Sequence, residues 1–311
     1  HIVVPKEAIE AETGIFLRTE KSVLFIIPWP RYWVIGTTDT AWHENIDHPV
    51  ATSADIDYVL EHANAVLEKP ISRKDIIGVY AGLRPLLQPG VKEGESGETA
   101  STKVSREHTV TEVAPGLTSI AGGKLTTYRV MAADAVDFAL GVEQTKVHPT
   151  CTERLALVGA AGLDEVTARS GEIARAHGWT LARVDHLLSR YGAETQDLIE
   201  LIDAKPEYGQ PLESAPAFLK AEVAWAVTHE GALHLDDIIV HRVRLDLEHR
   251  DHGLAAADEI AEIAAPLLGW SKDDVAAELA AYARRCTALA QAEKETEDAA
   301  AAAHLDGLGQ V

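Results

Sequence analysis

The pattern of apolar residues changes near residues 143–152, and this change limits the fold more than any other feature. Before it, short apolar runs between turn residues indicate β-strands at 2–4, 15–18, 23–28 and 33–37. After it, apolar residues recur at helical spacing, as at Leu181, Val184, Leu188 and Tyr191 and within 216–228, 235–247, 254–268 and 272–289. The sequence therefore predicts an α+β protein, with an N-terminal mixed β-sheet portion followed by an all-α C-terminal domain.

The same change divides the chain into three predicted parts. Residues 1–145 form the α+β portion, residues 146–292 form the helical domain, and residues 293–311 form a tail of alanine and acidic residues. Within the first part, residues 52–55 indicate a helix cap, and residues 75–87 are typical of a strand. The tail offers no apolar face, so a fraying helix or a disordered segment is predicted there.

Composition restricts the partners of this chain. Acidic residues number 49 and basic residues 28, which gives a formal net charge of −21. That field repels nucleic acid and anionic membrane surfaces, so any anionic ligand needs a local basic pocket. Cys151 and Cys286 lie far apart and form no CxxC pair, which fits a reducing cytoplasm and argues against a disulfide or zinc framework. No apolar run approaches the ~18 residues of a membrane span.

The start of the sequence is also informative. His1 stands where a methionine is usual, and residues 1–5 already have the character of a strand. We expect the sequence to be a segment of a larger protein.

Residues 117–129 predict a strand, a glycine turn and the start of a long helix. Gly122 and Gly123 form the turn, and Lys124 adds a cation where free N–H groups attract negative charge. The expected buried face of the helix comprises Leu125, Tyr128, Ala132, Ala135 and Ala139. A plain helix start with a solvated lysine is an equally good interpretation of this stretch alone. A P-loop is excluded, because Thr118 and Leu125 occupy positions that require Gly and Ser or Thr.

Arg84 is the second candidate for chemistry. It lies in an apolar stretch, where a guanidinium must be paired, and its planar fork suits a carboxylate or a phosphate. An internal salt bridge is an equally good interpretation. Arg106 is a weaker candidate, because Glu107 lies beside it and a surface pair is the usual outcome.

Other chemical motifs find little support. His229 and His234 are five residues apart, so on one helix they diverge by about 140° and share no metal. A cluster at His249, Asp251 and His252 is more often solvated than metal-bound. No metal site is predicted, and no serine or cysteine nucleophile has the required neighbours.

Four stretches together carry a family resemblance: residues 36–40, 80–86, 105–108 and 122–129. In this order and spacing, and above all in the Gly-Gly-Lys-Leu-Thr-Thr-Tyr-Arg run, the chain resembles the C-terminal half of bacterial, actinobacterial-like FAD-dependent glycerol-3-phosphate dehydrogenases. The resemblance extends from residue 1 to about residue 290. That family belongs to the D-amino-acid-oxidase-like flavoproteins.

The resemblance implies a cofactor and a substrate. FAD would contact Gly122, Gly123, Lys124, Leu125 and Thr126 at the helix start. Arg84 and Lys124 would be the catalytic residues and would hold sn-glycerol 3-phosphate with help from Thr126. The implied reaction transfers a hydride to flavin N5 and yields dihydroxyacetone phosphate.

The resemblance also implies partners and a location. Electrons would pass to a quinone, and the protein would be cytoplasmic with peripheral contact at the inner face of the plasma membrane. A homodimer is a further expectation.

The sequence departs from the family in one respect, because it contains no GxGxxG dinucleotide fingerprint. The half of the protein that binds the adenosine and pyrophosphate of FAD is therefore expected upstream of His1. A chain without that half is expected to be inactive alone. The general base stays open between Lys124, a water assisted by Arg84, and a residue outside this sequence.

Two alternative functions remain at this stage. In an amino-acid oxidase-like flavoenzyme, Arg84 would hold a carboxylate, whereas a phosphate needs the further donors Lys124 and Thr126. A non-catalytic docking or dimerisation module, built around the helical half, would bind no flavin.

Overall fold

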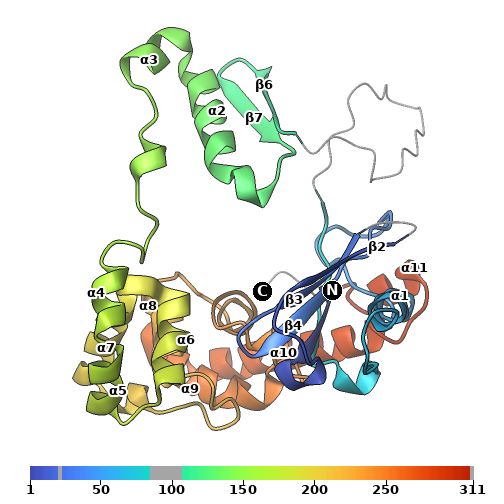
Figure 1. The fold of residues 1–311 in the computed structure, drawn as a ribbon, viewed down its shortest axis with the longest axis vertical. Helices are drawn as coiled ribbons and strands as arrows, with labels where there is room; N and C mark the ends of the chain where they lie inside the picture. Colours follow the sequence, from blue (N-terminus) through green and yellow to red (C-terminus); the bar gives the residue numbers. More distant parts are fainter. Residues whose placement is uncertain (20–22, 85–106, 309–311) are drawn as a thin grey trace. The chain divides into compact units, whose positions relative to one another are not determined.

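The computed structural model describes residues 1–19, 23–84 and 107–308 (Figure 1). The chain divides into two compact units. The first comprises residues 1–38, 42–82 and 158–311, and the second comprises residues 39–41 and 83–157. This division differs from the predicted boundaries after residues 145 and 292, because the N-terminal sheet and the helices beyond residue 158 form one unit. The functional division at those boundaries stays a prediction.

A five-stranded sheet forms the N-terminal part of the first unit. Its strands are β1 (Ile2–Pro5), β2 (Ile15–Arg18), β3 (Val23–Pro28), β4 (Tyr32–Gly36) and β5 (Gly78–Val79), in the order β2-β3-β4-β1-β5. All its strand pairs are antiparallel, so the sheet is antiparallel rather than mixed as predicted. The α+β class is confirmed. Of the strand predicted at 75–87, only Gly78–Val79 forms, and residues 85–87 lie outside the described residues.

One face of this sheet is buried against helix α1 (Ser53–Asn64). Leu24 and Ile26 of β3 are buried, while Phe25 and Ile27, which alternate with them, are exposed, as the period of two in a strand requires. The helix begins with the predicted cap, in which Thr52 Oγ1 accepts a hydrogen bond from the Asp55 N–H. The hydrophobic core between them comprises Ile2, Val4, Ile9, Leu24, Ile26, Trp33, Ile35, Ile56, Val59, Leu60, Ala63 and Ile71.

The rest of the first unit is helical, as predicted. Its α-helices are α4 (Leu163–Ala168), α5 (Ser170–His177), α6 (Leu181–Tyr191), α7 (Thr195–Ala204), α8 (Lys220–Thr228), α9 (Ala257–Leu268), α10 (Lys272–Ala292) and α11 (Asp298–Ala303). Residues 237–242 form a π-helix, η8 (Asp237–Arg242). Short 3-10 turns elsewhere are η1 (Lys6–Ala8), η2 (Arg73–Asp75), η4 (Leu125–Thr127), η5 (Thr152–Arg154), η6 (Gly192–Glu194), η7 (Pro206–Gly209), η9 (Leu245–Leu247) and η10 (Leu254–Ala256). Among the described residues, no helix is both long and apolar enough to cross a bilayer.

A charged network joins the β3–β4 turn to the helices. Arg31 binds both oxygens of Glu248, at 2.8 Å each, and its Nη1 lies 2.8 Å from His186 Nδ1. Because a guanidinium only donates, Nδ1 must accept, and the Nε2–H of His186 donates to Glu222 at 3.0 Å. The network thus ends on a carboxylate with no exposed surface.

Glu222 tolerates complete burial because several of its neighbours donate hydrogen bonds to it. The Tyr191 hydroxyl and the Leu219 N–H also donate to it, at 3.2 and 2.9 Å. Burial alone raises the pKa of this carboxyl, but the hydrogen bonds from His186 and Leu219 and the nearby Arg190 charge bring the pKa below its ordinary value. The charged form is therefore the stabilising one.

We expect Glu222→Gln to lower the free energy of unfolding by about 3 kcal/mol near neutral pH, because it removes the charge that the donors surround. The folded-state pKa lies below the unfolded value, so this contribution is present above about pH 4.5 and is lost as the pH falls further. Urea denaturation of both proteins across pH 3.5–7 measures the difference. The exposed, ion-paired Glu207 gives the matched control Glu207→Gln, and a Glu222→Gln loss as small as the control's would contradict the assignment.

The prediction of a fraying or disordered tail is wrong. Helix α11 packs against the end of α10 and the loop before α1 through a small cluster made of Val50, Ala288, Ala292, Ala301 and Leu305. The Ser53 N–H also donates to the Glu295 carbonyl at 2.7 Å. Alanine carries little apolar area, so its pattern in the sequence is a weak signal of burial, yet its small side chain permits the close approach that this cluster needs.

Leu305→Ala should therefore destabilise the protein by about 2–4 kcal/mol, because it leaves a cavity in a packed cluster. Thermal or urea denaturation measures the change. Asp306 is the neighbouring exposed residue, and Asp306→Ala should change stability by no more than about 0.5 kcal/mol. Equal effects of the two substitutions would mean that the tail does not pack.

The second unit contains the predicted hairpin and the helix after it. Strands β6 (Thr109–Ala114) and β7 (Leu117–Ala121) pair antiparallel, and α2 (Tyr128–Leu140) packs on both of them (Figure 1). Helix α3 (Val142–Val147) occupies part of the predicted linker. The prediction of a buried face on α2 is wrong, because no residue of α2 is buried. Two strands cover too little of the helix, and Leu125 before it is 88% exposed.

Candidate functional site

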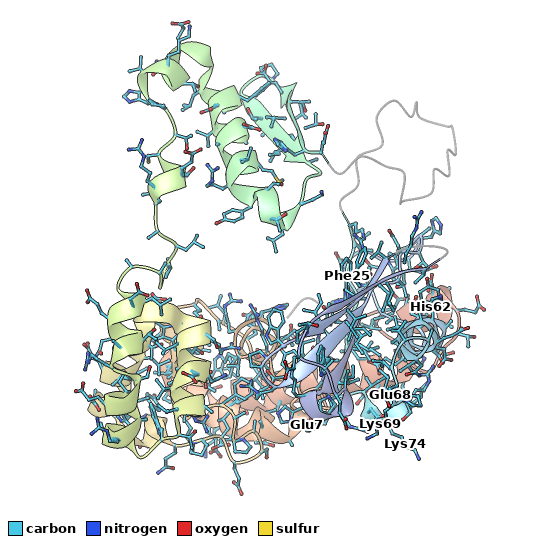
Figure 2. The ribbon with its side chains drawn as sticks, viewed as in Figure 1. Glu7, Phe25, His62, Glu68, Lys69 and Lys74 are labelled. Carbon is cyan, nitrogen blue, oxygen red and sulfur yellow. The ribbon has the colours of Figure 1, made fainter. Side chains whose placement is uncertain are left out.

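Two of the four stretches that carry the family resemblance, residues 36–40 and 80–86, meet at the face of the five-stranded sheet opposite α1. Across the strands, Phe16 pairs with Phe25, and Phe25 with Gly36. His1 continues this row, because the register that pairs Ile2 with Ile35 sets His1 beside Gly36. The sticks of Figure 2 show where Phe25 stands on the sheet. The row thus links the 36–40 stretch to the start of the chain.

His1 also contacts the 80–86 stretch. Its backbone exchanges hydrogen bonds of 2.9 and 3.0 Å with Tyr80, and the two aromatic rings stack with centroids 4.8 Å apart. A Cβ on Gly36 would lie 2.3 Å from His1 Cδ2, so the imidazole lies directly over Gly36 and a side chain there would displace it. The sequence analysis made no prediction for His1, although its place next to a strand and before the 36–40 stretch was a signal of this contact.

Arg84 pairs with an acid from the other stretch. Its Nε lies 3.8 Å from Asp39 Oδ1, and the side chains are 36% and 7% exposed respectively. Of the two interpretations of Arg84, the internal ion pair is therefore present. This distance is longer than a hydrogen bond, so the N–H groups of the guanidinium remain available to a ligand. Pro85, Leu86 and Arg106 lie outside the described residues.

The predicted strand–glycine–helix corner is confirmed. β7 ends at Ala121, and Gly122 and Gly123 have φ values of +78° and +82°, which favour glycine. The 3-10 turn Leu125–Thr127 then runs directly into α2. Lys124, Leu125 and Thr126 are all exposed.

The corner has the donors that an anionic ligand requires. In the first turn of a helical segment the N–H groups have no partner within the helix, which here concerns Leu125 and Thr126. Lys124 adds its ammonium beside them, while Thr127 Oγ1 donates to the Lys124 carbonyl at 3.0 Å and steadies the turn. The electron-rich pyrimidine end of a flavin fits this donor set. Between the described residues Arg84 and Lys124 no hydrogen bond or ion pair is formed.

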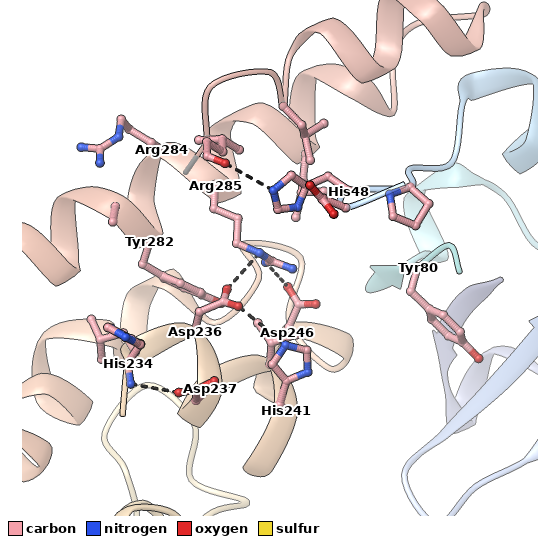
Figure 3. A pocket seen from close by; sticks show the side chains of 18 of the residues that line it. His48, Tyr80, His234, Asp236, Asp237, His241, Asp246, Tyr282, Arg284 and Arg285 are labelled. Carbon is pink, nitrogen blue, oxygen red and sulfur yellow. Dashed lines mark hydrogen bonds and ion pairs between the residues drawn. The ribbon is translucent and has the colours of Figure 1, made fainter. Parts of the chain in front are cut away.

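A cavity of about 690 Å³ lies elsewhere, within the first unit (Figure 3). Arg285 lies between Asp236 and Asp246, at 2.9 and 3.5 Å, and Asp246 also binds His252 Nδ1 at 2.8 Å. Burial raises the pKa of Asp246, but His252 and Arg285 outweigh it and bring this pKa below its ordinary value. These groups are joined to one another in ion pairs, although the buried Asp236 Oδ1 accepts no hydrogen bond, and we assign no ligand to this cavity.

The two histidines of the helical half whose spacing resembles a metal motif contact an acid and an aromatic ring. His234 Nδ1 lies 2.8 Å from Glu278 Oε1, whereas His229 stacks on Trp225 with ring centroids 3.7 Å apart. Helix α8 ends at Thr228, so the two histidines do not share a helix and the predicted angle between them does not apply. In the part of the chain that the structure describes, no three His, Cys, Asp or Glu side chains group as metal ligands would.

Comparison with known families supports the resemblance. Residues 1–129 match the family model described as FAD dependent oxidoreductase, and residues 150–275 match the model for the C-terminal domain of alpha-glycerophosphate oxidase.

Individual relatives agree with these matches. The glycerol-3-phosphate dehydrogenase of Mycobacterium leprae is 46% identical over 301 residues, which cover 97% of this chain and 50% of the relative. Glycerol-3-phosphate dehydrogenase 2 of Mycobacterium bovis gives the same identity and coverage, and the Synechocystis glycerol-3-phosphate dehydrogenase is 29% identical over 293 residues. The chain spans about half the length of these curated relatives.

A solved structure shares the fold. The glycerol-3-phosphate dehydrogenase of Bacillus halodurans, crystallised with FAD, aligns with a TM-score of 0.72 at 23% identity, over 92% of this chain and 55% of that one. The family models and the relatives agree over both parts of the sequence. The chain therefore belongs to the FAD-dependent oxidoreductases and corresponds to about half the length of a glycerol-3-phosphate dehydrogenase.

Proposed function

We propose that this chain is the C-terminal half of an FAD-dependent glycerol-3-phosphate dehydrogenase, which oxidises sn-glycerol 3-phosphate to dihydroxyacetone phosphate. The observation that carries the proposal is the corner at Gly122–Lys124. It combines two glycines of positive φ, an exposed lysine and free N–H groups in the most specific of the recognised stretches. The 46% identity to dehydrogenases of that name supports the same substrate.

Gly122, Gly123, Lys124, Leu125 and Thr126 would hold the pyrimidine end of FAD. The N–H groups of Leu125 and Thr126 would donate to it, and the Lys124 ammonium would stabilise the negative charge of its reduced form. When bound, the flavin supplies the acceptor, N5, for the hydride that leaves C2 of the substrate. The chain itself supplies orientation and charge.

Arg84 and Lys124 would hold the substrate phosphate, with Thr126 as a further donor. Asp39 engages the Nε side of Arg84, so the two Nη groups of the fork can bind two phosphate oxygens in parallel. In a chain with a net charge of −21, a dianionic substrate is stable only where such cations gather. A single guanidinium is enough to bind a carboxylate, whereas a phosphate dianion also uses the charge of Lys124. The presence of both cations therefore favours glycerol 3-phosphate over an amino acid as the substrate.

The remaining parts of the proposal rest on the family resemblance. Quinone would be the electron acceptor, and the protein would be a cytoplasmic homodimer that contacts the inner face of the plasma membrane. The proton of the substrate hydroxyl would pass to Lys124, to a water beside Arg84, or to a group of the dinucleotide-binding half.

The two cations should respond differently to conservative exchange. Arg84→Lys keeps the charge but loses the fork, whereas Lys124→Arg keeps a cation beside N–H groups that also donate. We expect Arg84→Lys to reduce kcat/KM for glycerol 3-phosphate about 10- to 150-fold and Lys124→Arg to reduce it less. The assay uses the full-length protein with its flavin content measured first. Arg175→Lys, an exposed exchange on α5, is the matched control and should leave kcat/KM unchanged.

Truncation tests the phosphate assignment itself. Arg84→Ala and Lys124→Ala should each weaken the preference for glycerol 3-phosphate over glycerol, because the phosphate is the group that they hold. If the double variant keeps the wild-type preference, the phosphate binds elsewhere. A colourless full-length protein that takes up no flavin would instead favour a docking or dimerisation module.

A further inference from the structure

A histidine and an aspartate connect the two sides of the Gly122–Gly123 corner. His108 lies just before β6, and Asp134 lies on α2. His108 Nε2 and Asp134 Oδ2 are 2.7 Å apart, the length of a charge-assisted hydrogen bond. The strand that precedes the corner and the helix that follows it are thereby tied together by side chains.

The glycine turn is packed against the same elements. A Cβ on Gly123 would lie 2.4 Å from Met131 Sδ and 3.3 Å from His108 Cβ. Met131 stands on α2, about one turn before Asp134. The φ of +82° is what favours glycine at this position, and the side chains of Met131 and His108 pack against the turn where a Cβ would point.

Lys124 and the free N–H groups of Leu125 and Thr126 follow directly from this packed turn. In contrast to the turn, these three residues are exposed, and apart from the contact between Lys124 and Thr127 no described side chain fixes them. The position of these three residues therefore depends on the turn and on the angle at which α2 leaves it.

We propose that His108 and Asp134 are positioning residues for the donors of this corner, a role that rests on the proposed function of the corner in holding the flavin. The pair fixes α2 against the start of β6, and so aims Lys124 and the N–H groups of Leu125 and Thr126. Oriented donors stabilise charge only where their geometry is set in advance, and small displacements weaken them steeply.

Both forms of the flavin should report on this pair. We expect His108→Ala and Asp134→Ala to raise the dissociation constant of FAD about tenfold, the effect of losing one charge-assisted hydrogen bond. The anionic reduced form depends on the donors more than the oxidised form does. A further tenfold loss for the reduced form corresponds to a two-electron potential lower by about 30 mV.

The experiment uses the full-length protein, with FAD affinity, flavin potential and melting temperature measured for each variant. His108→Gln is the rescue variant, because its side-chain amide can donate in place of Nε2–H. The double variant His108→Ala with Asp134→Ala should be no worse than the more affected single variant, since one contact joins the two residues. His304, which binds Glu295 at 3.0 Å in the first unit, gives the matched control His304→Ala, with wild-type flavin properties expected.

Wild-type affinity and potential in His108→Ala and Asp134→Ala would overturn the proposal, whatever happens to the melting temperature. Additive effects of the two substitutions, or no rescue by His108→Gln, would also overturn it. Failure of the proposed function gives a different result, because the wild-type protein itself would then bind no flavin or would not be reduced by glycerol 3-phosphate.

Discussion

The buried carboxylate of Glu222 is the constraint on which the first compact unit depends. An ionised group without exposed surface is stable only when donors surround it. Here these come from α6 and from the residue before α8, while Arg31 of the β3–β4 turn bonds to the donor His186. The network therefore fixes where the sheet lies relative to the helices of its unit. It also positions the strand β4, whose end carries Gly36.

Local features of this fold could be predicted from the sequence, because the determining residues are neighbours along the chain. The Thr52 cap, the 109–121 hairpin, the Gly122–Gly123 turn and most helices of residues 181–289 all follow from short patterns. The burial of individual surfaces could not be predicted. Whether Leu305 or Leu125 is covered depends on distant segments, and in both places the expected exposure was reversed.

The candidate site shows the same division. Arg84, Lys124 and Thr126 could be named as candidates from the stretches that carry the family resemblance, but their surroundings depend on pairs of residues that are far apart in sequence. Asp39 reaches Arg84 across more than forty residues, and His1 reaches Tyr80 through antiparallel pairing. No local pattern marks an aspartate as the partner of a given arginine, so the choice between a ligand and an internal ion pair required the structure.

The net negative charge of the chain makes the ion pairs of these cations important for ligand binding. A chain with a net charge of −21 offers any cation many acidic neighbours, and an arginine that paired fully with one of them would have little attraction left for a phosphate. Asp39 leaves Arg84 able to attract a phosphate, because it lies 3.8 Å from Nε and does not pair with the two Nη groups. Lys124 is also available, because it lies on an exposed turn where no acidic side chain of the described residues bonds to it. The two cations are thus kept available by geometry, in a protein whose overall composition opposes the binding of anions.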